Sequence, residues 1–85
     1  MQNYVFMIGY IENIDIKDYA NQETRGKVTL KVNNDFFNIH TNGEIAKNIR
    51  LVCNKNDLIG IKGHLDIEKG KIIINVERVS FLKSN

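Results

Sequence analysis

The side chains that most often carry catalysis or bind metals are few in this chain and stand far apart. His40 and His64 are the two histidines, Cys53 is the single cysteine, and the ten carboxylates are scattered. No pair has the HxH or CxxC spacing of a metal site, and the phosphate-loop, dinucleotide and nucleophile-elbow motifs are missing. We therefore expect no enzyme, no metal and no cofactor. The histidines should face solvent from separate strands, and Cys53 should pack as a small side chain.

A second kind of chemistry is indicated by polar side chains that alternate with apolar ones in residues 25–33 and 36–40. The outward positions are Arg25, Lys27, Thr29, Lys31 and Asn33 in the first stretch and Phe36, Asn38 and His40 in the second. None of these eight residues is acidic. Cations meet phosphates and flat rings stack on unpaired bases, so this combination suits a binder of single-stranded nucleic acid. Lys62, His64 and Lys71 are expected to extend the same surface.

Each half of this pattern also has a purely structural explanation. Any half-buried strand shows polar residues to solvent, and lysine is common among them, while Phe36 could pack under a loop. The combination favours nucleic acid, because an aromatic ring on the solvent side of a strand, beside cations without carboxylates, is not required for folding.

Alternating hydrophobicity predicts the elements that position these side chains. The expected strands are residues 4–16, 26–33, 35–41, 58–67 and 72–82, and a short amphipathic helix over 44–52 is expected to be capped by Thr41 or Asn42. The short Asn34–Asp35 link makes the second and third strands an antiparallel hairpin. The predicted fold class is all-β: a five-stranded OB-fold barrel with one short helix between strands three and four. We expect one such domain over residues 1–85.

The bulk composition is that of an ordinary globular domain, with 42% hydrophobic and 26% charged residues. Cations exceed anions by only two, so the distribution of charge has to indicate a polyanionic partner. The sequence has no apolar run of membrane-spanning length and no signal-peptide pattern at its start, which predicts a cytoplasmic protein. Residues 4–11 are apolar at both parities, so both faces of the first strand should be covered. A chain this short has a small core, and oligomerisation would help to stabilise it.

Several short motifs, in order along the chain, resemble the bacterial single-stranded DNA-binding proteins, the SSB family. Val5–Ile11 looks like the family's first strand, Asp35–Ile39 like its third, and Val79–Leu82 like its last. The stretch Asp57–Leu65, with the sequence DLIGIKGHL, looks like the fourth strand and is the most specific of these motifs. The resemblance covers nearly the whole chain. It is closest in character to a minimal member from a phage or mobile element, or to a primosome protein of the PriB type.

This resemblance implies roles for the residues that match. Phe36 falls where the family places a base-stacking aromatic, and Tyr10 follows the glycine of the first strand and would face the same groove. Family members commonly pair through the first strand, which implies a homodimer or homotetramer through Tyr4–Ile11. Three departures imply a smaller footprint, weaker binding and no tail-mediated recruitment: the Glu68–Lys71 hairpin is short, a second stacking aromatic has no counterpart, and the acidic tail is missing.

The sequence thus predicts a non-catalytic protein that binds single-stranded DNA in replication or recombination, with replication proteins as further partners. The residues expected to bind the nucleic acid are Tyr10, Arg25, Lys27, Lys31, Phe36, Asn38, His40, Lys62, His64 and Lys71. Two other functions of the same fold stay open: a protein-interaction module of the primosome type, and an RNA binder.

Overall fold

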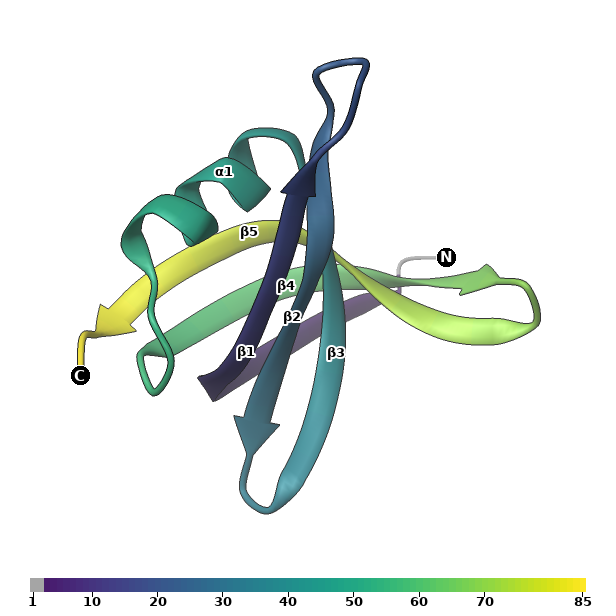
Figure 1. Cartoon of the computed structure of the whole chain (residues 1–85). Coiled ribbons are helices and arrows are strands. Elements are labelled where there is room, and N and C mark those ends of the chain that lie inside the picture. Colours follow the sequence, from purple (N-terminus) through teal and green to yellow (C-terminus); the bar gives the residue numbers. More distant parts are fainter. Residues whose placement is uncertain (1–2) are drawn as a thin grey trace.

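Five long strands and one helix make up the computed structural model, which describes residues 3–85 (Figure 1). In chain order the elements are β1 (Tyr4–Asp18), β2 (Thr24–Val32), β3 (Asp35–Asn42), α1 (Gly43–Val52), β4 (Leu58–Glu68) and β5 (Lys71–Lys83). The strands close into a barrel in the order β1-β2-β3-β5-β4. The β3–β5 contact is parallel and the other contacts are antiparallel. The predicted fold class, an OB-type barrel with a short helix between β3 and β4, is confirmed.

Strand β1 pairs with both β4 and β2, and this double pairing closes the barrel. Its first half, Tyr4–Tyr10, pairs with β4, and its second half, from Tyr10 onward, pairs with β2. A bulge between Ile11 and Asn13 marks the change, as expected where a strand turns from one sheet to another. Gly26 lets β2 approach β1 closely, because a Cβ there would collide with the carbonyl oxygen of Asp15.

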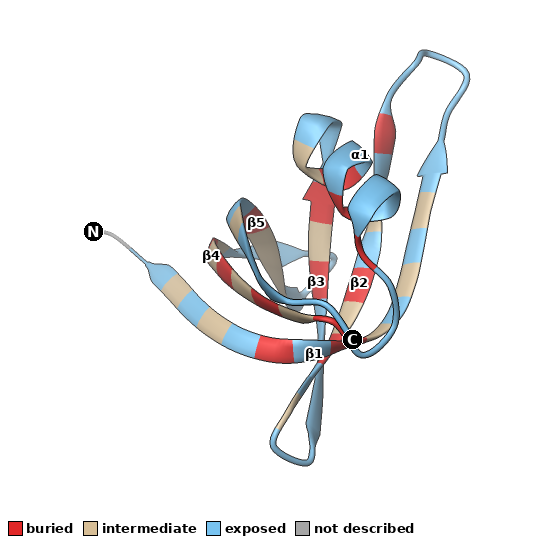
Figure 2. Cartoon of the chain, turned by 90° about the vertical axis from the view of Figure 1, so that its left-hand side faces the viewer, coloured by how far each residue is buried: buried red, intermediate tan, exposed pale blue. Residues whose placement is uncertain are grey.

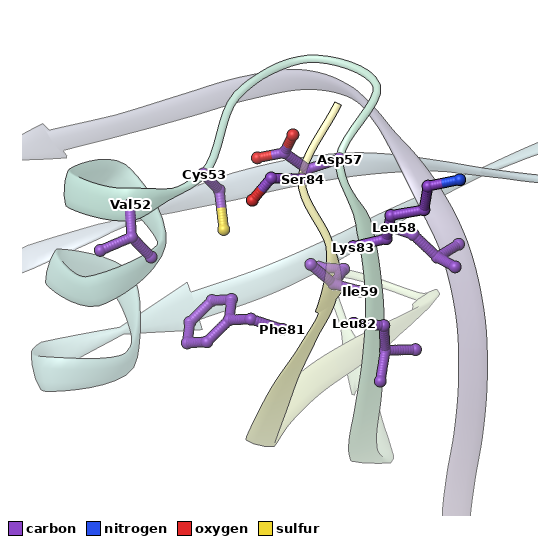
Figure 3. A pocket seen from close by; sticks show the side chains of 9 residues that line it. All are labelled: Val52, Cys53, Asp57, Leu58, Ile59, Phe81, Leu82, Lys83 and Ser84. Carbon is purple, nitrogen blue, oxygen red and sulfur yellow. The ribbon is translucent and has the colours of Figure 1, made fainter.

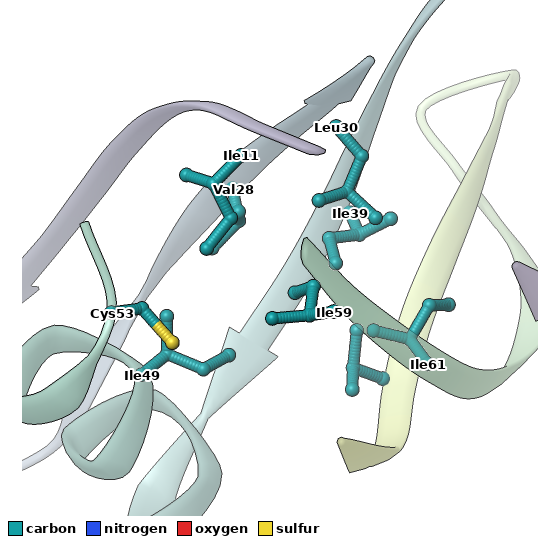
Figure 4. Close-up of a cluster of buried hydrophobic side chains, with 9 residues drawn as sticks. Ile11, Val28, Leu30, Ile39, Ile49, Cys53, Ile59 and Ile61 are labelled. Carbon is teal, nitrogen blue, oxygen red and sulfur yellow. The ribbon is translucent and has the colours of Figure 1, made fainter. Parts of the chain in front are cut away.

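The core lies inside the barrel and under α1 (Figure 4). Its most deeply buried side chains are Ile11, Val28, Leu30, Ile39, Ile49 and Ile59. They come from four strands and α1, and Val76 adds β5, so all five strands contribute to one small apolar interior. Cys53 is buried beside Ile49, as the sequence predicted, and the desolvation raises the pKa of its thiol.

Helix α1 begins one residue earlier than the amphipathic pattern predicts. Asn42, one of the two predicted N-cap residues, occupies the N-cap position with extended backbone, although its side chain makes no capping hydrogen bond. Gly43 follows with φ +60°, a conformation that glycine adopts without strain. Arg50 anchors the last turn by donating to the Asp18 carboxylate at 3.1 Å. Within residues 3–85, no helix has the length and apolar character needed to cross a lipid bilayer.

One face of β1 departs from the expectation that both would be covered. Val5, Met7 and Ile11 point inward, whereas Phe6 is 73% exposed and Ile8 60% exposed. Figure 2 shows this alternation of exposed and covered residues along β1. The double apolar pattern of the first strand is real, but only one of its faces meets the core of this chain. A barrel has one interior, so the other face is left on the outer surface.

Candidate nucleic-acid interface

The polar side chains predicted to bind nucleic acid gather on the outer side of β2 and β3, together with the second half of β1. We call this surface the polar face. Its cross-strand neighbours from β2 to β3 are Arg25 with Asn42, Lys27 with His40, Thr29 with Asn38, and Lys31 with Phe36. The Thr29 hydroxyl donates to the Asn38 amide oxygen at 2.7 Å, which holds the centre of the face in place. Six of the ten predicted site residues lie on these two strands, and Tyr10 joins them from β1.

An aromatic row crosses three strands at one end of the polar face. Tyr10 on β1 lies opposite Lys31 on β2, and Lys31 lies opposite Phe36 on β3. Both rings are open to solvent, with Tyr10 51% and Phe36 58% exposed. Two flat rings with an ammonium group between them offer stacking surfaces for bases and a contact for the phosphate that links them.

Strand β1 also adds a carboxylate that the two-strand pattern did not reveal. Asp15 lies opposite Lys27, and its carboxylate is 3.8 Å from the ammonium of Lys17. Lys17 in turn lies opposite Arg25. The outward cations of β2, namely Arg25, Lys27 and Lys31, form what we call the β2 stripe. On the β1 side this stripe is bordered by one cation, Lys17, and one anion, Asp15, so the net charge of the polar face is unchanged.

At the opposite end from the aromatic row, the face deepens into a cleft of about 420 Å³. We call it the β1–β2 turn cleft; it is lined by Tyr19, Arg25, Gly26, Lys27, His40, Thr41, Asn42, Glu68 and Asn75. The guanidinium of Arg25 lies 4.3 Å from the centre of the Tyr19 ring, a cation–π contact. Tyr19 was not among the predicted site residues. It is an aromatic residue in an otherwise polar loop, and alternation with a period of two predicts nothing about loop residues.

Three predicted residues lie outside the polar face. Lys62 is on β4 and places its ammonium 4.3 Å from the centre of the Tyr4 ring. Lys71 begins β5 in the β4–β5 hairpin, which projects away from the barrel (Figure 1), and lies opposite Glu68, at the edge of the β1–β2 turn cleft. His64 is the nearest of the three, because Asn75 on β5 lies between it and His40 in register.

His64 is not a free surface histidine. Its Nε2 is 2.9 Å from the Asp66 carboxylate and its Nδ1 is 3.8 Å from that of Glu77. The Asn75 amide also donates to Asp66. Asp66 lies two residues along β4 on the same side as His64, and β5 adds Glu77. These two carboxylates make His64 a poor candidate for phosphate contact. Among the described residues, no group of three or more His, Cys, Asp and Glu side chains is arranged to hold a metal ion.

The first half of β1, together with β4 and β5, presents a different outer surface, which we call the apolar face. Its exposed side chains include Phe6, Ile8 and Leu82, and the last two lie over Gly60. They line a hollow of about 330 Å³ together with Lys62, Arg78 and Ser80. In the described structure residues 4–8 pair with β4 alone, so the other edge of β1 is unpaired there. Tyr10 lies at the border of the two faces, opposite both Lys31 and Leu58.

A further cleft of about 350 Å³ lies between the end of α1 and the end of β5 (Figure 3). It is closed on one side by Asp57, which is 5% exposed and accepts backbone hydrogen bonds from Asn54 and Asn85, both at 2.8 Å. These bonds hold the pKa of the Asp57 carboxyl below its usual value. The Asp57 carboxylate thereby links Asn85 to the 54–57 turn, so its role is structural.

Solved structures of other proteins share the shape of this barrel. The yeast mitochondrial single-stranded DNA-binding protein Rim1, from S. cerevisiae, superposes with a TM-score of 0.84 over 100% of this chain and 98% of its own, at 14% identity. The SSB domain of a Synechococcus sp. protein superposes with a TM-score of 0.78 over 93% of this chain and 94% of its own, also at 14% identity. No protein-family model matches the sequence, and no curated protein matches it. The chain therefore has the OB fold of the SSB domains along essentially its full length.

Proposed function

We propose that this protein binds single-stranded DNA on its polar face and carries out no chemistry on it, in DNA replication or recombination. The observation that supports this most directly is the row Tyr10–Lys31–Phe36, in which exposed rings flank a cation across three strands. Exposed apolar side chains are common on protein surfaces, so the support lies in the arrangement, two rings in register with a cation between them. The shared fold with Rim1 and with the SSB domain agrees with this proposal.

Two kinds of side chain would contact the DNA on this face: cations at the phosphates and aromatic rings at the bases. Lys27, Lys31 and Arg25 would neutralise phosphates and release the counterions condensed on the strand, a contribution that does not depend on sequence. Tyr10 and Phe36 would stack on bases, which every base permits because each has a flat π surface. A duplex hides its base faces in its own stack, so the rings favour an unpaired strand.

The direct test is fluorescence anisotropy with a labelled oligo-dT, competed by an unlabelled duplex and by an RNA strand of equal length. We expect the single strand to bind and the duplex to compete weakly. Equal competition by the duplex would contradict the role of the rings. Stronger competition by the RNA would instead favour the RNA-binding alternative.

We also propose that a second copy of the chain covers the apolar face. The free edge of β1 at residues 4–8 and the exposed Phe6, Ile8 and Leu82 support this. An unpaired edge beside an apolar patch is a site for strand pairing, and a homodimer or homotetramer would remove both from water. Light scattering of the purified protein tests it. A monomer at micromolar concentration would favour the alternative that this face binds a different protein, as in a primosome-type interaction module.

A further inference from the structure

The β1–β2 turn cleft differs in chemistry from the aromatic row, and the difference concerns which base is bound. The row offers only ring faces and an ammonium group. The cleft has a ring too, but it is surrounded by groups that donate and accept hydrogen bonds in fixed places. Its volume of about 420 Å³ is at the lower end of the range for small-ligand pockets, enough for one nucleotide.

The platform of the cleft is a two-layer stack. The turn holds Tyr19 through two backbone hydrogen bonds: its N–H donates to the Glu23 carbonyl at 2.8 Å, and its own carbonyl accepts from Gln22 at 2.9 Å. The Arg25 guanidinium covers the ring at 4.3 Å, while Tyr19 stays 43% exposed. A flat, positioned stack of this kind accepts a base on its open side.

The polar groups around this platform are uncommitted. Within residues 3–85, no hydrogen bond or ion pair of the protein occupies the His40 imidazole, the Asn42 amide or the Glu68 carboxylate. Thr41, which is 3% exposed and whose hydroxyl has no partner in the described part of the chain, lines the same cleft. Buried or clustered polar groups without partners favour a ligand that supplies them.

The charged groups of the cleft suit both parts of a nucleotide. Arg25 and Lys27 are cations that can meet its phosphate, and Glu68, the one carboxylate lining the cleft, can accept a hydrogen bond from an amino group of its base. Carboxylates read exocyclic amino groups of bases, cytosine N4 in particular. Thymine and uracil carry a carbonyl oxygen at that position and would meet the carboxylate as acceptor against acceptor.

We propose that the β1–β2 turn cleft holds one unpaired base that carries an exocyclic amino group, stacked on the Tyr19–Arg25 pair and read by Glu68. This inference rests on the proposed single-strand binding and adds base preference to it. Tyr19 and Glu68 then become specificity-determining residues, at the opposite end of the polar face from Phe36.

The experiment compares dC and dU oligonucleotides of equal length by anisotropy at pH 8, where cytosine is neutral. The two bases have the same ring size and lack a methyl group, and they differ in the donor and acceptor pattern of the pairing edge. We expect the wild-type protein to bind dC about fivefold more tightly, near the lower end of the discrimination that a direct base contact supplies. In Glu68→Gln the ratio should fall to about one, because an amide both donates and accepts.

Two sets of control variants separate base reading from general effects of charge and of the ring. Glu77→Gln makes the same charge change on β5 but does not line the cleft, so it should keep the dC preference. Tyr19→Leu should weaken dC and dU binding equally, by about fivefold or more, while Tyr19→Phe should retain affinity, since the ring does the stacking. Circular dichroism checks that each variant is folded.

Equal affinity for dC and dU in the wild type, or a dC preference that survives Glu68→Gln, would overturn the base-reading cleft and leave single-strand binding intact. Failure to bind either strand would instead overturn the proposed function itself, and the cleft with it.

Discussion

The polar face and the apolar face are built from the same barrel and even share β1, yet they present opposite chemistry to solvent. On the polar face, exposed rings are separated by cations and amides, as in Tyr10–Lys31–Phe36. On the apolar face, Phe6, Ile8 and Leu82 line one hollow, and Lys62, Arg78 and Ser80 are the polar residues that share it. A row of rings and charges suits a charged, flexible partner, whereas a mainly apolar hollow with a few polar groups suits a rigid protein surface.

Strand β1 shows how one element supplies both. Its even-numbered residues point outward throughout the first half, but the strand leaves β4 for β2 at Tyr10 and the bulge that follows. Residues before the bend therefore face the β4–β5 side, and residues after it face the β2–β3 side. Tyr10 borders both faces, so covering the apolar face would also restrict one edge of the aromatic row.

The largest effect should come from placing a charge on the apolar face. Ile8→Lys puts an ammonium group at the centre of the proposed contact, where its desolvation is not compensated, and we expect the oligomer to separate into single chains. Light scattering measures the mass. Ile67→Lys is the matched control, because Ile67 is 77% exposed on the projecting hairpin and not on this face. If both variants keep the wild-type mass, the apolar face is not the contact between copies.

The salt dependence of binding should distinguish the two faces most clearly. If about four cations of the polar face each neutralise one phosphate, the plot of log affinity against log salt has a slope of about −2.8, an affinity loss of about 50-fold between 50 and 200 mM. Self-association through the apolar face should change little or strengthen over the same range. Anisotropy and light scattering on the same samples measure both. A salt-independent affinity for oligo-dT would contradict phosphate contact at the β2 stripe.

Removing a ring from the aromatic row should give a smaller, more local effect. Phe36→Ala should weaken oligo-dT binding by about 1–3 kcal/mol through lost stacking, with the fold intact because the ring is 58% exposed. Phe81→Ala removes a phenylalanine of similar exposure, 53%, from the other side of the barrel and should leave binding unchanged. Equal effects of the two substitutions would indicate that hydrophobic exposure in general, and not the row, governs binding.

The smallest effect concerns Asp57, which belongs to neither face. Its hydrogen bonds from Asn54 and Asn85 lower the pKa of the folded-state carboxyl below the usual value of about 4. Its stabilising contribution is therefore complete above pH 4 and is lost as the pH falls through the folded-state pKa. We expect the urea midpoint of Asp57→Asn to lie below that of the wild type at pH 6, and the difference to narrow below pH 4.

The Asp18 carboxyl, whose pKa is lowered by the Thr24 hydroxyl and by Arg50, titrates in both proteins and cancels in this difference. A difference between Asp57→Asn and the wild type that stays constant with pH would show that packing, and not charge, explains the effect. Unchanged oligomeric mass and oligo-dT affinity at pH 7 would confirm that both faces are independent of this anchor.

Much of this molecule was predictable because side-chain parity in a strand is local. The alternation in residues 26–33 and 35–41 placed Lys27, Lys31 and Phe36 on the outside, and the structure has them there. The five strands and the helix were predictable for the same reason, with ends that differ by one or two residues. The double apolar pattern of Tyr4–Ile11 also identified a strand with more hydrophobic surface than one barrel interior can cover.

What the sequence by itself determined, then, is which residues form strands and which of their side chains point outward, since a period of two is read from neighbours along the chain. Only the tertiary structure decided which outward residues share a surface. Closure of the barrel through β3 and β5 separated Lys62 from the polar face, brought Glu77 of β5 to His64 of β4, and set Glu68 of β4 in one cleft with Arg25 of β2. These neighbours come from different strands and depend on register, which no local pattern encodes.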